Sequence, residues 1–101
     1  MLLNFKTPPY LMKKVDICIN MEEANSFFNT TLPSSLIEFW ESYEAILFDN
    51  SICIYGFETA KEENPNHGIE KWVPDFIMVG NDGGGQGIFI QKNDENLKFI
   101  I

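Results

Sequence analysis

The sequence contains no arginine and only one histidine, His67. A lone histidine in a polar segment such as Asn64–Gly68 is more typical of a surface residue than of a general base. No serine lies in a Gly-x-Ser-x-Gly motif, which the nucleophile of many hydrolases needs. We therefore predict no catalytic residue, although a small enzyme that uses His67 or Asp82 remains a third hypothesis.

Cysteine is also scarce. Cys18 and Cys53 are the only two, each within a run of β-forming apolar residues. Outside a secretory context, such cysteines behave more often as small buried hydrophobic residues than as a disulfide. Two cysteines and one histidine without CxxC, HxxxH or HExxH spacing do not suffice for a zinc site. We therefore predict no metal and no cofactor.

Long apolar runs are missing, because no segment approaches the ~20 residues that a membrane-spanning helix needs. The N-terminal residues also lack the basic start, apolar stretch and small-residue cleavage site of a secretory signal. We expect a cytoplasmic chain without a membrane partner.

Positively charged residues are few, and the net charge is −8. Residues 16–63 include ten acidic residues and only one lysine, Lys61. Such a field repels nucleic acid and favours encounter with a basic partner; the alternative is a solvated surface that keeps the protein soluble. The ten are Asp16, Glu22, Glu23, Glu38, Glu41, Glu44, Asp49, Glu58, Glu62 and Glu63.

What is abundant is apolar and aromatic. The 101 residues are 45% hydrophobic and include nine phenylalanines, enough for one modest core. We predict a single domain over residues 1–101, with residues 1–13 as a lead-in because Pro8-Pro9 blocks early regular structure.

Two helices are predicted early in the chain, after a short strand over residues 14–19. Asn20, with Glu23 three residues later, is typical of a helix N-terminus, and the helix should end near residues 29–31. Residues 32–35 start a second helix, with proline in its first turn. The first helix should bury Met21, Ala24, Phe27 and Phe28, and the second Leu36, Trp40 and Tyr43, with Glu38, Glu41 and Glu44 toward its other face.

Strands dominate the remainder. Residues 45–48 and 52–55 flank turn residues Asp49–Ser51 and predict a hairpin, and residues 58–64 predict a short helix ended by residues 65–68. A last strand over residues 97–101 would leave a sheet edge or a dimer seam, hence a monomer or weak homodimer. The order predicts an α+β fold, with two N-terminal helices packed on a mostly antiparallel twisted sheet.

A glycine turn joins two further predicted strands, Phe76–Val79 and Ile88–Ile90. A phosphate-binding loop should open a helix, whereas Gly83-Gly84-Gly85 opens a strand and lacks a following Gly-Lys-Ser/Thr. A hairpin turn or bulge is favoured. Asp82 is more typical of a side chain that caps its own turn than of a cation ligand.

Trp72 stands apart from these patterns. It lies in a connecting segment between Lys71 and Val73-Pro74. If exposed, it would suit the anchor of a protein interface; the alternative is packing under the loop.

Three motifs in order resemble the SUKH superfamily, which holds bacterial immunity proteins and the yeast Smi/Knr cell-wall regulators. The motifs are Leu-Pro followed by an aromatic helix (residues 32–40), Ile54-Tyr55-Gly56, and the strand and glycine turn of residues 76–85. Similarity extends over roughly residues 20–91. The chain differs at residues 42–45, where relatives usually have Asn-Gly.

The resemblance implies binding rather than catalysis, since bacterial members are mostly predicted to neutralise toxins, often nucleases. An acidic inhibitor suits a basic nuclease because it can mimic phosphate charge. Our hypothesis is a cytoplasmic immunity protein with a cognate toxin as partner; the alternative is a regulatory or scaffold protein-binding domain of the Smi/Knr type. The candidate partner-binding residues are Glu38, Glu41, Glu44, Asp49, Glu58, Glu62, Glu63, Trp72 and Asp82.

Overall fold

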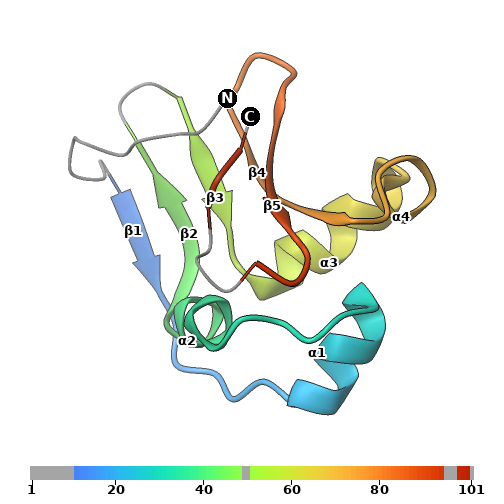
Figure 1. Ribbon diagram of the computed structural model, residues 1–101. Helices are drawn as coiled ribbons and strands as arrows, with labels where there is room; N and C mark the ends of the chain where they lie inside the picture. Colours follow the sequence, from blue (N-terminus) through green and yellow to red (C-terminus); the bar gives the residue numbers. More distant parts are fainter. Residues whose placement is uncertain (1–10, 49–50, 95–97, 101) are drawn as a thin grey trace.

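The computed structural model describes residues 11–48, 51–94 and 98–100. Within them, five strands form one antiparallel sheet in the order β1-β2-β3-β4-β5, with β1 and β5 at its two edges (Figure 1). The α+β class and the antiparallel sheet are confirmed. The strands are β1 (Leu11–Lys14), β2 (Tyr43–Leu47), β3 (Cys53–Tyr55), β4 (Phe76–Asn81) and β5 (Gly87–Gln91).

The same residues form four helices, two before β2 and two between β3 and β4. The early pair was expected, whereas the later pair extends beyond the single short helix that the sequence predicts. The helices are α1 (Met21–Phe28), α2 (Ser34–Ser42), α3 (Phe57–Asn66) and α4 (Ile69–Trp72).

Both predicted hairpins are confirmed. β2 pairs with β3 with Ala45 opposite Tyr55, and β4 pairs with β5 with Phe76 opposite Gln91. The β4–β5 register shifts between Met78 and Gly80, as at a β-bulge.

The start of α1 is as predicted. The Asn20 side chain accepts a hydrogen bond from the Glu23 backbone N–H at 3.0 Å, which satisfies one of the free donors at a helix N-terminus. The predicted apolar face is only half buried, however. Ala24 and Phe28 lie in the core, while Met21 and Phe27 are exposed.

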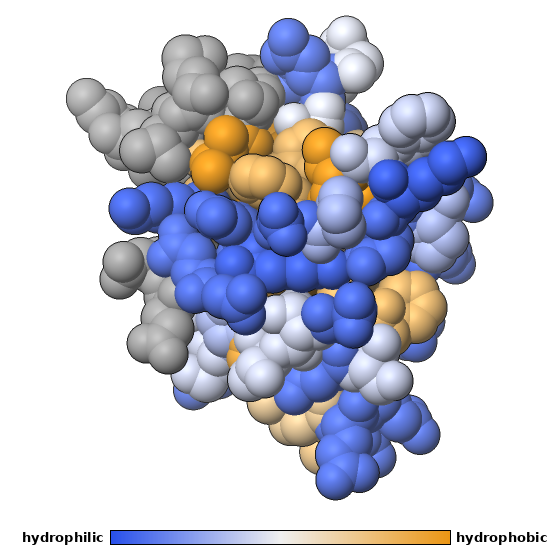
Figure 2. Space-filling view, turned by 45° about the vertical axis from the view of Figure 1, so that its right-hand side comes forward, coloured by the Kyte–Doolittle hydropathy of each residue, from blue (hydrophilic) through white to orange (hydrophobic). Residues whose placement is uncertain are grey.

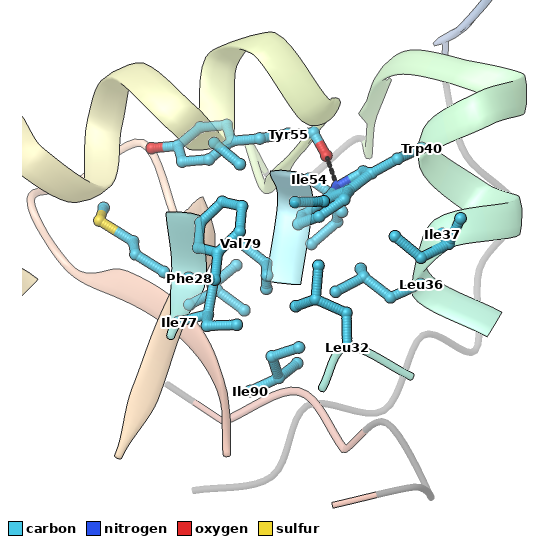
Figure 3. Close-up of a cluster of buried hydrophobic side chains, with 14 of the residues drawn as sticks. Phe28, Leu32, Leu36, Ile37, Trp40, Ile54, Tyr55, Ile77, Val79 and Ile90 are labelled. Atoms are coloured by element: carbon cyan, nitrogen blue, oxygen red, sulfur yellow. Dashed lines mark hydrogen bonds between the residues drawn. The ribbon is translucent and has the colours of Figure 1, made fainter. Parts of the chain in front are cut away.

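Helix α2 supplies the centre of the core. Trp40 is fully buried, as predicted, and its indole N–H donates to the Tyr55 carbonyl at 3.2 Å (Figure 3). Pro33 lies at the N-cap, one residue before the first turn, and Tyr43 belongs to β2 rather than to the helix. Around Trp40 the helices and the sheet bury Phe28, Leu36, Ile37, Ile54, Ile77, Val79 and Ile90 (Figure 3).

The prediction for residues 14–19 is wrong. The strand lies earlier, at Leu11–Lys14, so residues 11–13 of the expected lead-in belong to the sheet, and residues 1–10 lie outside the described residues. The following segment runs along the end of α2, where Ile17 N–H donates to the Glu41 carbonyl at 3.1 Å. Cys18 is exposed there and is not a core residue; Cys53 is partly buried.

At the C-terminal end, the described residues of the predicted last strand, 98–100, form one bridge, Phe89 with Ile100. Residues 95–97 and 101 of that prediction lie outside the described residues. Helix α3 continues through Pro65 to Asn66, so the proline does not end it where expected.

Candidate functional site

Trp72 is the most exposed large hydrophobic residue described, with 72% of its surface accessible. Packing under the loop, one of the two alternatives, is therefore excluded. The residue ends α4, a four-residue helix that starts after Gly68. Gly68 has φ of 63°, a left-handed conformation that favours glycine, and a Cβ there would approach the indole Cδ1 at 3.1 Å. Lys71 places its Nζ 5.1 Å from the centre of the indole ring.

A groove of about 390 Å³ lies beside this tryptophan, between the end of α1, the α3–α4 turn and β4. Phe27, at its rim, is 48% exposed. Figure 2 turns toward the viewer the side of the molecule where α1 and α4 are labelled in Figure 1. A hydrophilic band crosses the middle of this face, and the most hydrophobic surface in the view lies above that band. Apolar lining comes from Phe27, Phe28, Ile69, Phe76 and Ile77, and polar lining from Asn64, Glu70, Lys71 and Lys92.

An unequal ion pair lies in the groove wall. The Lys92 side chain is only 7% exposed, whereas that of Glu70 is 59% exposed, and Lys92 Nζ lies 2.7 Å from Glu70 Oε2. The hydrogen bond from Lys92, with a weaker one from Asn29, holds the pKa of the Glu70 carboxyl below its usual range. The lysine side chain is thus buried, and its ammonium group is paired with a carboxylate whose side chain is mostly exposed to solvent.

Asn64, which lines the groove, connects helix α3 to strand β4 through its side chain. Its amide donates to the Ala60 carbonyl at 2.7 Å and to the Met78 carbonyl at 2.9 Å, and its side-chain oxygen accepts from Met78 N–H at 2.8 Å. The pairing of β3 with β4 comprises Cys53 with Asn81 and Ile54 with Gly80, and it does not extend to Met78. At Met78 the Asn64 side-chain amide, instead of a β3 residue, forms the hydrogen bonds to the β4 backbone. The sequence prediction missed this role because nothing in the local sequence marks Asn64, inside the last turn of a helix, as a partner for a strand.

A second, more polar groove of about 420 Å³ lies between α3 and the glycine turn. Tyr55 accepts a hydrogen bond from the Asn81 amide at 2.9 Å, and His67 Nε2 lies 3.0 Å from Glu63 Oε2. His67 is exposed and is oriented by a residue one helical turn earlier. Neither cysteine lines this groove or the first one.

Asp82 caps the glycine turn, as predicted. One carboxylate oxygen accepts from Gly84 N–H at 2.8 Å and from Gln86 N–H at 3.0 Å. These backbone hydrogen bonds lower the pKa of the carboxyl, because they favour its charged form.

This arrangement predicts a local acid transition. Since the folded pKa lies below the unfolded one, the turn keeps this stabilisation above the unfolded pKa and loses it as pH falls through the folded pKa. In an NMR titration, the Gly84 and Gln86 amides should shift together, with a midpoint below that of Asp in an unstructured peptide. Independent midpoints would contradict a shared cap.

Most of the predicted acidic residues interact with other groups of the protein and do not form one continuous surface of unpaired charge. Glu41 accepts a hydrogen bond from Ile19 N–H at 2.9 Å, and Glu44 lies in β2, 3.1 Å from Lys13 Nζ. The idea that Glu41 and Glu44 share a helix face is therefore wrong. Glu58 pairs with Lys61 at 3.3 Å, Glu63 with His67, and Asp82 caps its turn.

Two predicted residues have no such ties. Glu38 on α2 and Glu62 on α3 are exposed and form no ion pair among the described residues. Asp49 lies outside the described residues. The charge available to a partner is thus less concentrated than the sequence suggested.

In residues 11–48, 51–94 and 98–100, no group of three or more His, Cys, Asp or Glu side chains is placed to hold a metal ion. None of the described helices is long and apolar enough to cross a membrane. No protein-family model matches the sequence, and no curated protein matches it.

Proposed function

We propose that this chain is a non-catalytic protein-binding domain that acts in the cytoplasm as an immunity protein of the SUKH type and neutralises a cognate toxin by occlusion. The observation that carries the proposal is the exposure of Trp72 next to Gly68 and Lys71, two residues that line an apolar groove. The alternative is a regulatory or scaffold domain of the Smi/Knr type, which would bind a cellular protein through the same surface.

Exposed apolar side chains support a protein partner. Tryptophan is enriched among the residues that dominate interface energies, and isolated apolar residues on a surface need no explanation, whereas grouped ones do. Here Trp72 is followed by exposed Val73, and it lies beside Gly68, which lines the same groove as Phe27. Together they offer an anchor next to a concave surface.

Charge supports a basic partner. The net charge of −8 accelerates encounter with a cationic protein and disfavours nucleic acid. A basic nuclease toxin fits this description, because an acidic inhibitor can replace the phosphates that the toxin engages. Glu38 and Glu62 are the predicted residues best available for such contacts.

The proposal is tested by co-expression with the product of the neighbouring toxin gene, followed by purification of the complex. Relief of toxicity together with a stable complex is the expected result. Retention of a cellular protein without relief of any toxin would favour the regulatory alternative. If neither a complex nor relief is observed, the proposal is wrong.

Trp72→Ala should weaken partner binding by roughly 30-fold, which corresponds to a hot-spot loss of about 2 kcal/mol. The measurement is the dissociation constant from titration calorimetry. Because the indole is exposed, the free energy of unfolding should change little. Leu11→Ala, an exposed apolar truncation on β1, is the matched control; a larger effect at Leu11 would place the interface at the β1 edge instead.

A further inference from the structure

We propose that the groove beside Trp72 is a binding site for a small organic carboxylate with an apolar, preferably aromatic, body. The inference does not depend on the immunity function. It rests on two features in one place: an apolar cavity and a buried ammonium group in its wall.

The cavity fits a small ligand. Its volume of about 390 Å³ lies in the range of ligand pockets, and its apolar walls come from three separate elements. Phe28 comes from α1, Ile69 from α4 and Ile77 from β4. An aromatic ring there would cover the exposed side chain of Phe27 and the partly exposed one of Phe76, which line the same groove.

Lys92 supplies the polar recognition. A lysine ammonium has three N–H donors, and among the described residues Glu70 is the only side-chain acceptor of Lys92. Buried donors are normally satisfied. A ligand carboxylate would accept one of the remaining hydrogen bonds as a charge-assisted contact, which is about twice as strong as a neutral one.

Glu70 occupies the position that such a carboxylate would take or share. It is mostly exposed while Lys92 is buried, so the glutamate can move into solvent and the lysine stays fixed. The ligand would therefore exchange with Glu70: the Glu70 carboxylate accepts the hydrogen bond from the Lys92 ammonium until a ligand carboxylate replaces it.

The ligand class is tested with phenylpropionate and its neutral analogue phenylpropanol, by NMR titration of the full chain. Phenylpropionate should bind at least about tenfold tighter than phenylpropanol and shift the Gly68 and Lys92 amides. Equal binding of the two would overturn the role of the ammonium, and binding of neither would overturn the site.

Variants assign the contact. Lys92→Met should weaken phenylpropionate about tenfold and leave phenylpropanol unchanged. Lys61→Met, which removes a lysine outside the groove, should change neither. Glu70→Gln removes the competing carboxylate at an exposed position and should strengthen phenylpropionate severalfold; weaker binding would overturn the exchange. It also keeps the test valid if Lys92→Met fails to fold.

A further arm separates free acids from polypeptide ends. A tripeptide that ends in phenylalanine with a free C-terminus presents the same ring and carboxylate. It should bind no tighter than phenylpropionate. A preference of tenfold or more for the peptide would overturn the small-acid proposal and identify the groove as a site for a protein C-terminus.

Discussion

Asn64→Asp should lower the free energy of unfolding at neutral pH by about 4 kcal/mol, the range seen when a buried charge loses its compensation. The Asn64 amide now donates to the Ala60 and Met78 carbonyls. A carboxylate has no N–H to donate, so it would face two carbonyl oxygens in a site that is 8% exposed. The melting temperature should fall by roughly 20 °C.

The pH dependence of this variant separates charge from packing. Burial and the two carbonyl oxygens raise the folded pKa of the new carboxyl above its unfolded value. The destabilisation is therefore complete above the folded pKa and shrinks as pH falls through it, because the protonated carboxyl regains one donor. Denaturant melts between neutral and mildly acidic pH measure this recovery.

Asn66→Asp is the matched control, since Asn66 is exposed two residues later. It adds the same charge to an already acidic chain and should change stability by no more than about 0.5 kcal/mol. Equal losses in the two variants would show that the Asn64 bridge to β4 contributes little. In that case general charge repulsion would be the cause.

Local patterns predicted most of the elements near the core. The Asn20 cap, the buried indole of Trp40 and the two hairpins each follow from short-range chemistry: a capping side chain, an apolar helix face and turn residues between β-forming runs. These signals agree with the tertiary structure, so propensity and packing point to the same answer.

The errors arise where distant contacts decide. Residues 15–19 alternate like a strand, yet their amides bond to the end of α2, with Ile19 N–H on the Glu41 side chain. This contact also removes Glu41 from the predicted acidic face. Periodicity cannot reveal which backbone a segment will meet, and so it missed both facts.

The candidate site was predictable only in part. Trp72 was recognised as a possible anchor, but its exposure depends on α4, a helix too short to give a periodic signal. Lys92 and Glu70 lie 22 positions apart, and nothing in either local sequence marks them as a pair. The groove exists because α1, α4 and β4 meet, which is a property of the fold alone.

Gly80→Ala should cost about 3 kcal/mol of unfolding free energy, the upper range for an overpacked core. Gly80 is buried in β4, opposite Ile54 of β3. A Cβ there would collide with the Cys53 carbonyl oxygen, a backbone atom that cannot move without separating the two strands. Glycine is needed at position 80 because the backbone of β3 lies so close to it. A left-handed backbone is not the reason, since the described glycines with positive φ are Gly68, Gly83 and Gly85.

Gly84→Ala provides the control for this substitution. It makes the same chemical change in the exposed turn after β4, where a Cβ would meet the Asp82 side chain at an ordinary 3.6 Å. Stability there should stay within about 0.5 kcal/mol of the parent.

Because β4 also carries the Met78 groups bound by Asn64, separation of β3 from β4 should disturb the groove as well. Gly80→Ala should therefore lose phenylpropionate binding before it unfolds globally, whereas retained binding together with parental stability would show that β3 and β4 tolerate a methyl group between them.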